Sequence, residues 1–97
     1  MRLEWSRSAL EDRDNVFDYI AQDHPQAAVM VDDRIRARVE ILSKFPKMGR
    51  PGRIEGTREL MISRTPYIVA YRVEGETVRI LRVLHGAQLW PDELHEK

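Results

Sequence analysis

The feature that most constrains this chain is a pair of apolar runs at residues 67–73 and 77–85. Both runs are rich in β-branched and aromatic residues, a composition typical of β-strands. Between them lies a short break centred on Gly75, which indicates a hairpin loop. Strands with so few polar positions are typical of the middle of a sheet, so we expect the rest of the chain to pack around this hairpin.

Two arginines decide the expected register of the hairpin. A two-residue loop would place Arg72 opposite Arg79, and like charges in that position are destabilising. A three-residue loop at residues 74–76 avoids this repulsion. In that register the core face is expected to hold Tyr67, Val69, Tyr71, Val73, Leu81 and Val83. The other face is expected to stay open for a partner, and it holds Ile68, Ala70, Arg72, Val78, Ile80 and Arg82.

Length and composition limit the chain to one small domain. Its 97 residues fit a single domain over residues 1–97 with one modest core. The lack of cysteine excludes disulfides and thiolate metal sites. No run of residues is long and apolar enough to span a bilayer, so we expect a cytoplasmic protein that contacts no membrane. Residues 92–97 are expected to form a frayed acidic tail.

The charges are divided unevenly along the chain, although they sum to zero. Residues 1–43 carry six basic and nine acidic side chains, whereas residues 44–85 carry nine basic and four acidic ones. This asymmetry favours an acidic partner for the second half, either nucleic acid or an acidic protein segment. The alternative is a solvated surface on which the charges are segregated by chance.

The segment before the hairpin predicts a short strand and two helices. Residues 2–5 alternate polar and apolar side chains, as a strand does. Ser8 and Glu11 match a capping box, so a first helix is expected to begin within residues 6–8. Pro25 suits the first turn of a second helix. The apolar stripe of that helix is expected to consist of Ala28, Val31, Ile35, Val39 and Leu42.

Residues 45–53 contain two prolines and two glycines and are expected to form a loop, which Lys47, Arg50 and Arg53 make basic. Residues 57–63 then predict a strand that leads into the hairpin. The order is therefore strand, helix, helix and three strands. It predicts an α+β fold in which an antiparallel helical hairpin packs on one face of a small, mainly antiparallel sheet. The first strand has to return to that sheet, which would leave the sheet mixed.

Four phrases of the sequence together resemble the RelE/ParE superfamily of bacterial toxins from type II toxin-antitoxin modules. They are FPKMGRPG at residues 45–52, PYIVAYRV at 66–73, ILRVLHGAQ at 80–88 and WP at 90–91. The resemblance covers nearly the whole chain. It implies a small toxin that arrests growth and is held inactive by a cognate antitoxin in a hetero-oligomeric complex. It also implies that operator DNA is contacted only through the antitoxin.

The superfamily contains two branches with different targets. The RelE-like branch cuts messenger RNA on the ribosome, and the ParE-like branch blocks DNA gyrase by binding. In the nuclease branch an arginine typically follows the aromatic residue that begins the strand, and Ile68 stands at that position here. A second arginine of that branch aligns with Gln88. These departures favour the ParE-like branch, for which no cofactor is expected.

The alternative of a ribosome-dependent mRNA interferase needs a base, an acid and a cation that stabilises the pentavalent phosphate. The residues that would supply these roles are His85, Arg82, Arg64, Arg58 and Glu59. Their spacing follows no pattern that this chemistry demands, and a histidine at a strand end is more often structural. The three histidines share no local spacing, so no metal site is expected.

If the protein acts by binding, its contacts are expected on the open sheet face and near the chain end. Arg72 and Arg82 suit acidic groups of an antitoxin, and Trp90 suits the centre of an interface. The residues expected to bind partners are Ile68, Ala70, Arg72, Ile80, Arg82 and Trp90. The basic loop with Lys47, Arg50 and Arg53 is a separate candidate site, which the nuclease alternative would use together with His85. A third hypothesis is a degenerate, non-toxic protein that only binds its antitoxin.

Overall fold

The structure is a computed structural model that describes residues 1–88, 90, 91 and 94. Its elements, in chain order, are β1 (Arg2–Trp5), α1 (Arg7–Ala21), α2 (Pro25–Ile41), β2 (Arg50–Pro51), β3 (Arg58–Met61), β4 (Tyr67–Glu74) and β5 (Thr77–His85). The predicted α+β order is confirmed, with the very short strand β2 added between α2 and β3.

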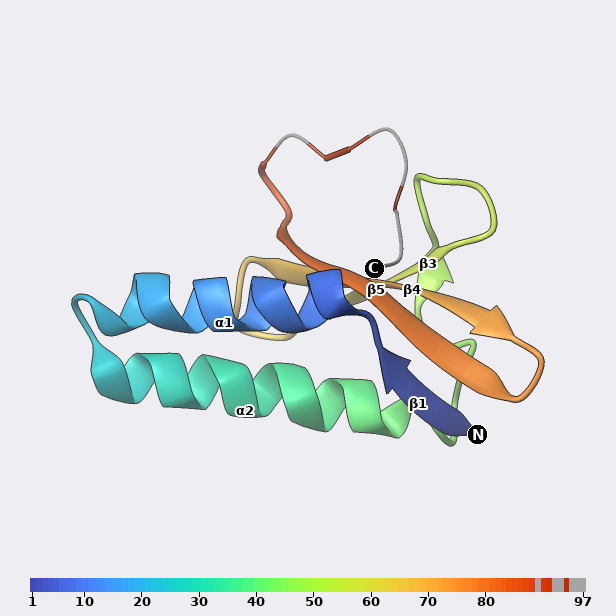
Figure 1. The fold of residues 1–97 in the computed structure, drawn as a ribbon, viewed down its shortest axis with the longest axis horizontal. Coiled ribbons are helices and arrows are strands. Elements are labelled where there is room, and N and C mark those ends of the chain that lie inside the picture. Colours follow the sequence, from blue (N-terminus) through green and yellow to red (C-terminus); the bar gives the residue numbers. More distant parts are fainter. Residues whose placement is uncertain (89, 92–93, 95–97) are drawn as a thin grey trace.

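The five strands form one sheet, and the two helices lie side by side as an antiparallel pair next to it (Figure 1). The strand order is β1-β5-β4-β3-β2, with β1 parallel to β5 and the other neighbouring strands antiparallel. The first strand therefore returns to the sheet beside the last one, and the sheet is mixed as predicted. This arrangement leaves β1 and β2 as the two edges.

The predicted apolar stripe of α2 packs against the sheet. Four of its five members are fully buried, namely Ala28, Ile35, Val39 and Leu42, and Val31 is partly buried. The main core joins Ile35, Val39 and Leu42 to the hairpin residues Val69, Tyr71, Val78 and Ile80. Burial of one such aliphatic side chain contributes about 1.5–3 kcal/mol, so this contact is a principal source of stability.

The start of α1 is held by Ser6. The helix begins at Arg7, within the predicted range, but its cap is Ser6 rather than Ser8. The Ser6 hydroxyl accepts the Ala9 N–H at 3.0 Å and donates to the Leu81 carbonyl at 2.9 Å. One buried hydroxyl thus caps the helix and ties it to β5.

The predicted three-residue loop of the hairpin is wrong, because the chain turns in two residues. Glu74 pairs with Thr77, which leaves residues 75–76 as the turn. Gly75 has a φ of 57°, a conformation that suits glycine at the first position of a two-residue turn.

Strand β5 contains one extra residue, Leu81. The register shifts between the pair Ala70–Arg82 and the pair Tyr71–Ile80, as at a β-bulge. Leu81 therefore packs on the opposite side of the sheet from the main core. Two residues predicted for the open face lie instead in the main core, Val78 and Ile80.

Arg72 does lie opposite Arg79, and each of the two guanidinium groups forms an ion pair with a different carboxylate. Arg72 contacts Glu74 at 3.3 Å, and Arg79 contacts Glu4 at 2.6 Å. Hydrogen bonds from Arg2 and Arg79 hold the pKa of Glu4 below its ordinary value. Glu4 belongs to β1, so its ion pair with Arg79 comes from outside the hairpin. This ion pair offsets the repulsion between Arg72 and Arg79, which was the reason to expect a three-residue loop.

The prediction that the second sheet face stays open is wrong. A second apolar cluster covers it, made of Ala70, Leu81, Leu84 and Leu94 with the partly buried Ile54 and Trp90. Leu94 is 8% exposed, so Trp90 and Leu94, which follow β5 in the chain, pack against this face of the sheet. The other residues of the predicted frayed tail, 92–93 and 95–97, lie outside the described residues.

Candidate functional site

The three aliphatic residues expected to bind partners are buried. Ile68, Ala70 and Ile80 are each 5% exposed or less. Trp90 is half-buried, and its indole N–H donates to the His85 carbonyl at 3.3 Å. The Arg53 guanidinium lies 3.6 Å above the Trp90 ring, as in a cation–π contact. The predicted exposure of the three aliphatic residues is therefore wrong.

Arg82 is paired within the chain. Its Nε and Nη2 donate to the two carboxylate oxygens of Asp12 on α1 at 2.7 and 3.0 Å. Asp12 also accepts the Val83 backbone N–H at 2.8 Å. The hydrogen bonds to Asp12 raise the pKa of Arg82. Arg82 thus joins α1 to β5, and its charge is already matched by a carboxylate of the same molecule.

Two members of the nuclease alternative lie on opposite sides of β4. Glu59 is opposite Ala70 on the β3 side, and His85 is opposite Tyr67 on the β5 side. Ala70 and Tyr67 are three residues apart along the strand, about 10 Å. Glu59 and His85 are therefore separated across the sheet by the width of β4 and along the strands by about three residues.

The three arginines of that alternative have separate environments. Arg58 donates to the Gly49 carbonyl at 2.7 Å and holds the loop after α2. Arg64 is exposed in the turn between β3 and β4, with a φ of 63°. Arg82 is paired with Asp12. The structure therefore does not gather the five residues around one phosphate-sized site.

Glu59 anchors the predicted basic loop. Its carboxylate is 3% exposed and accepts the Arg53 backbone N–H at 2.7 Å, Arg53 Nε at 3.2 Å and Arg50 Nη2 at 3.2 Å. Burial raises the pKa of Glu59, but the hydrogen bonds from Arg53 and Arg50 outweigh it, so the pKa lies below its ordinary value of 4.5. Arg50 and Arg53 thus bind Glu59 while their side chains stay partly exposed, and Lys47 is exposed as well.

Glu59→Gln should flatten the dependence of stability on pH in the acid range. A carboxylate with a depressed folded pKa stabilises the protein above its unfolded pKa, and this contribution is lost as the pH falls through the folded pKa. We expect the wild-type Tm to fall more steeply than the variant Tm between about pH 5 and pH 3. Thermal melts followed by circular dichroism measure this. Glu55→Gln, at an exposed position between β2 and β3, should keep the wild-type slope.

A shallow pocket of about 410 Å³ lies where β4 begins and β5 ends. It is lined by Asn15, Val16, Tyr19, Pro66, Tyr67, His85 and Gln88. The Tyr67 and His85 rings meet edge to face with centroids 5.7 Å apart, and His85 Nδ1 accepts the Ala87 N–H at 3.0 Å. Burial raises the pKa of the Tyr67 hydroxyl, which therefore stays protonated. The pocket offers one imidazole nitrogen, but none of the residues that line it is a lysine or arginine.

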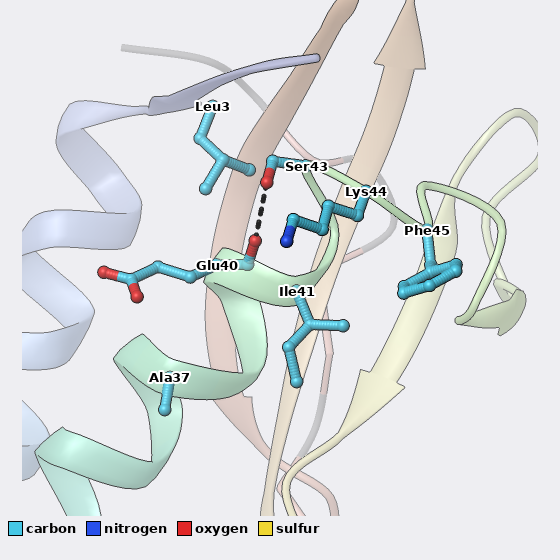
Figure 2. Close-up of a pocket in the computed structure, with 7 residues that line it drawn as sticks. All are labelled: Leu3, Ala37, Glu40, Ile41, Ser43, Lys44 and Phe45. Atoms are coloured by element: carbon cyan, nitrogen blue, oxygen red, sulfur yellow. Dashed lines mark hydrogen bonds between the residues drawn. The ribbon is translucent and has the colours of Figure 1, made fainter.

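A wider groove of about 680 Å³ lies between the end of α2 and β1 (Figure 2). We call it the α2 groove, and it is lined by Leu3, Ala37, Glu40, Ile41, Ser43, Lys44 and Phe45. At the end of the helix the Ser43 hydroxyl donates to the Glu40 carbonyl at 2.8 Å, as Figure 2 shows. A hollow of about 540 Å³ formed by residues 44–48 shares Lys44 and Phe45 with it.

The α2 groove was missed in the sequence because its apolar residues fall outside the buried stripe of the helix. Ile41 and Phe45 are four residues apart and both precede Pro46, so they lie on one side of the last helical turn and the loop after it. Two large apolar residues at this spacing, displaced from the core stripe, were the signal that such a surface exists.

None of the helices in the described part of the chain has the length and apolar character that crossing a membrane requires. Among the same residues, no three histidine, aspartate or glutamate side chains are grouped as metal ligands.

Comparison with known proteins identifies similar chains over nearly the full length. Residues 3–90 match a family model described as the ParE toxin of the type II toxin-antitoxin system parDE. Y4kP of Sinorhizobium fredii, which is named as a toxin, is 44% identical over 93 residues, 96% of each chain. The toxin RelE2 of Caulobacter vibrioides is 34% identical over 91% of this chain and 98% of its own.

The fold also matches a solved structure. A chain from a structure described as the chromosomal ParDE TA system from P. aeruginosa has a TM-score of 0.82 and 31% sequence identity. The match covers 88% of this chain and 95% of that chain. Sequence and fold therefore point to the same group of proteins.

Proposed function

This chain belongs to the ParE toxin family of type II toxin-antitoxin systems, and we propose that it arrests bacterial growth by binding DNA gyrase in the cytoplasm. A cognate antitoxin would hold it inactive in a hetero-oligomeric complex. In that complex the antitoxin, and not this chain, would contact operator DNA. The observation that carries the proposal is the family match over residues 3–90, which includes both helices and the whole sheet apart from Arg2.

The use of the charged side chains supports binding over catalysis. Arg82 is matched by Asp12, and Glu59 is matched by Arg50 and Arg53. Acid–base catalysis requires such groups to be turned towards a substrate. In this chain they stabilise the fold, so its exposed surfaces are better suited to contact with another protein.

The purified protein should reduce the supercoiling activity of DNA gyrase and leave ribosome-bound message intact. A plasmid supercoiling assay measures the first effect, and primer extension on translated message measures the second. Full gyrase activity at saturating protein would contradict the proposal. If expression of the protein alone also causes no growth defect, the chain is the degenerate, non-toxic partner of an antitoxin.

A ribosome-dependent endoribonuclease is the second candidate. The pocket at Tyr67 and His85 and the similarity to the toxin RelE2 favour it. In the primer-extension assay, discrete cuts that are absent with His85→Ala but remain with His24→Ala would establish this function. His24 is a matched control because it is exposed at the start of α2 and makes no side-chain cap hydrogen bond. Intact message with the wild-type protein would reject it.

A further inference from the structure

We propose that the α2 groove and the adjoining edge of β1 bind an extended segment of the antitoxin in which acidic side chains flank large apolar ones. The inference rests on the proposed function and adds the place and chemistry of the neutralising contact. Exposed apolar side chains, an open strand edge and unmatched positive charge support it together.

Large apolar side chains are exposed along the groove and the hollow next to it. Ile41 is 38% exposed, Phe45 61% and Met48 37%. They follow one another at spacings of four and three residues, from the last residue of α2 into the loop after it. A contiguous apolar patch that remains in contact with water typically marks a surface for another protein.

The edge strand β1 adjoins the same groove. Arg2 and Ser6 donate their backbone N–H groups towards β5, to the carbonyls of Glu76 and Ile80, each at 2.9 Å. Because backbone groups alternate in direction along a strand, the N–H and C=O of Leu3 point away from β5. Leu3 also lines the groove. A segment that pairs with β1 would therefore place alternate side chains along the groove.

The charge around the groove selects an acidic occupant. Lys44 and Lys47 are exposed, and neither forms an ion pair with a carboxylate of the described residues. Glu40, which lines the groove, contacts Arg36 at 3.4 Å and is already matched. In a dimer of this chain that used the same surface on both copies, the lysines of the two copies would repel each other. A nucleic acid would have to pack its charged backbone against the largely apolar side chains that line the groove. A segment with both acidic and apolar residues matches the whole surface.

The test measures binding to the product of the open reading frame adjacent to this gene, where the antitoxin is expected. Phe45→Glu should raise the Kd at least tenfold, because a carboxylate replaces the most exposed apolar side chain of the groove. Lys44→Glu should raise it about tenfold, because it reverses the charge that the acidic segment meets. Both positions are exposed, so thermal melts should confirm that both variants fold.

Met30→Glu is the matched control, because Met30 is 54% exposed on α2 and does not line the groove. It should bind with wild-type affinity. Wild-type affinity in both groove variants would overturn the inference, as would an equal loss in the control. Failure of the proposed function is distinguishable, because the supercoiling assay tests gyrase inhibition without the adjacent gene product, whereas the groove variants change only the Kd of the complex with that product.

Hydrogen exchange tests the pairing with β1 separately. In the complex the Leu3 amide should exchange at least tenfold more slowly than in the unbound protein, because the partner's backbone would accept its hydrogen bond. Binding that depends on Phe45 without protection of Leu3 would mean a helical occupant and would overturn the extended-segment proposal.

Discussion

Replacement of Tyr71 by phenylalanine should lower the free energy of unfolding by about 2–4 kcal/mol and the Tm by about 15 °C. Tyr71 is fully buried, and its hydroxyl donates to the Pro46 carbonyl at 2.7 Å and accepts the Gly49 N–H at 2.8 Å. The loop approaches so closely because position 49 is a glycine, where a Cβ would lie 2.7 Å from the tyrosine hydroxyl. Phenylalanine would leave both backbone groups without this partner, at a cost of about 1–3 kcal/mol each.

Tyr67→Phe is the matched control for this prediction. Tyr67 lies in the same strand at 8% exposure, and its hydroxyl forms no hydrogen bond with the described residues. Its removal should change the free energy of unfolding by less than about 0.5 kcal/mol. Urea denaturation followed by circular dichroism measures both variants. Equal midpoints for the two would show that the hydroxyl contact between β4 and the loop contributes nothing to stability.

Replacement of Asp12 by alanine should cost about 2–3 kcal/mol of stability. The change removes three hydrogen bonds, two from the Arg82 guanidinium and one from the Val83 N–H. The Arg82 side chain is only 28% exposed, so water recovers part of the lost interaction but not all of it. Ser6 still ties the start of α1 to β5 in this variant, so the loss is expected at the contact between Asp12 and the Arg82–Val83 part of β5.

Two further variants separate the contributions of Asp12. Asp14→Ala removes an exposed carboxylate from the same helix and should change stability by less than about 0.5 kcal/mol. Asp12→Asn keeps an oxygen for the Val83 N–H but removes the charge opposite Arg82, so an intermediate loss is expected. Denaturation midpoints for Asp12→Ala and Asp14→Ala that coincide would refute a structural role for this ion pair.

The candidate site was only partly predictable from the sequence. The basic loop at residues 45–53 is indeed irregular apart from β2, and its Arg50 and Arg53 form ion pairs with Glu59, a contact that the sequence did not indicate. A charge count records how many cations a segment holds and not which carboxylates fold against them. The α2 groove was missed for a related reason, since periodicity identifies the face that a helix buries and not the end that it leaves exposed.

Local patterns by themselves determined the elements of this protein. Alternating and β-branched residues located the β4–β5 hairpin, and three- and four-residue spacing located α2 and its buried stripe, because backbone geometry sets these repeats within a few residues. The tertiary structure alone decided the two-residue turn and the partner of Arg82. Glu4 is 75 residues from Arg79, and Asp12 is 70 residues from Arg82. Contacts over such separations form only when the chain has folded, and no short-range repeat encodes them.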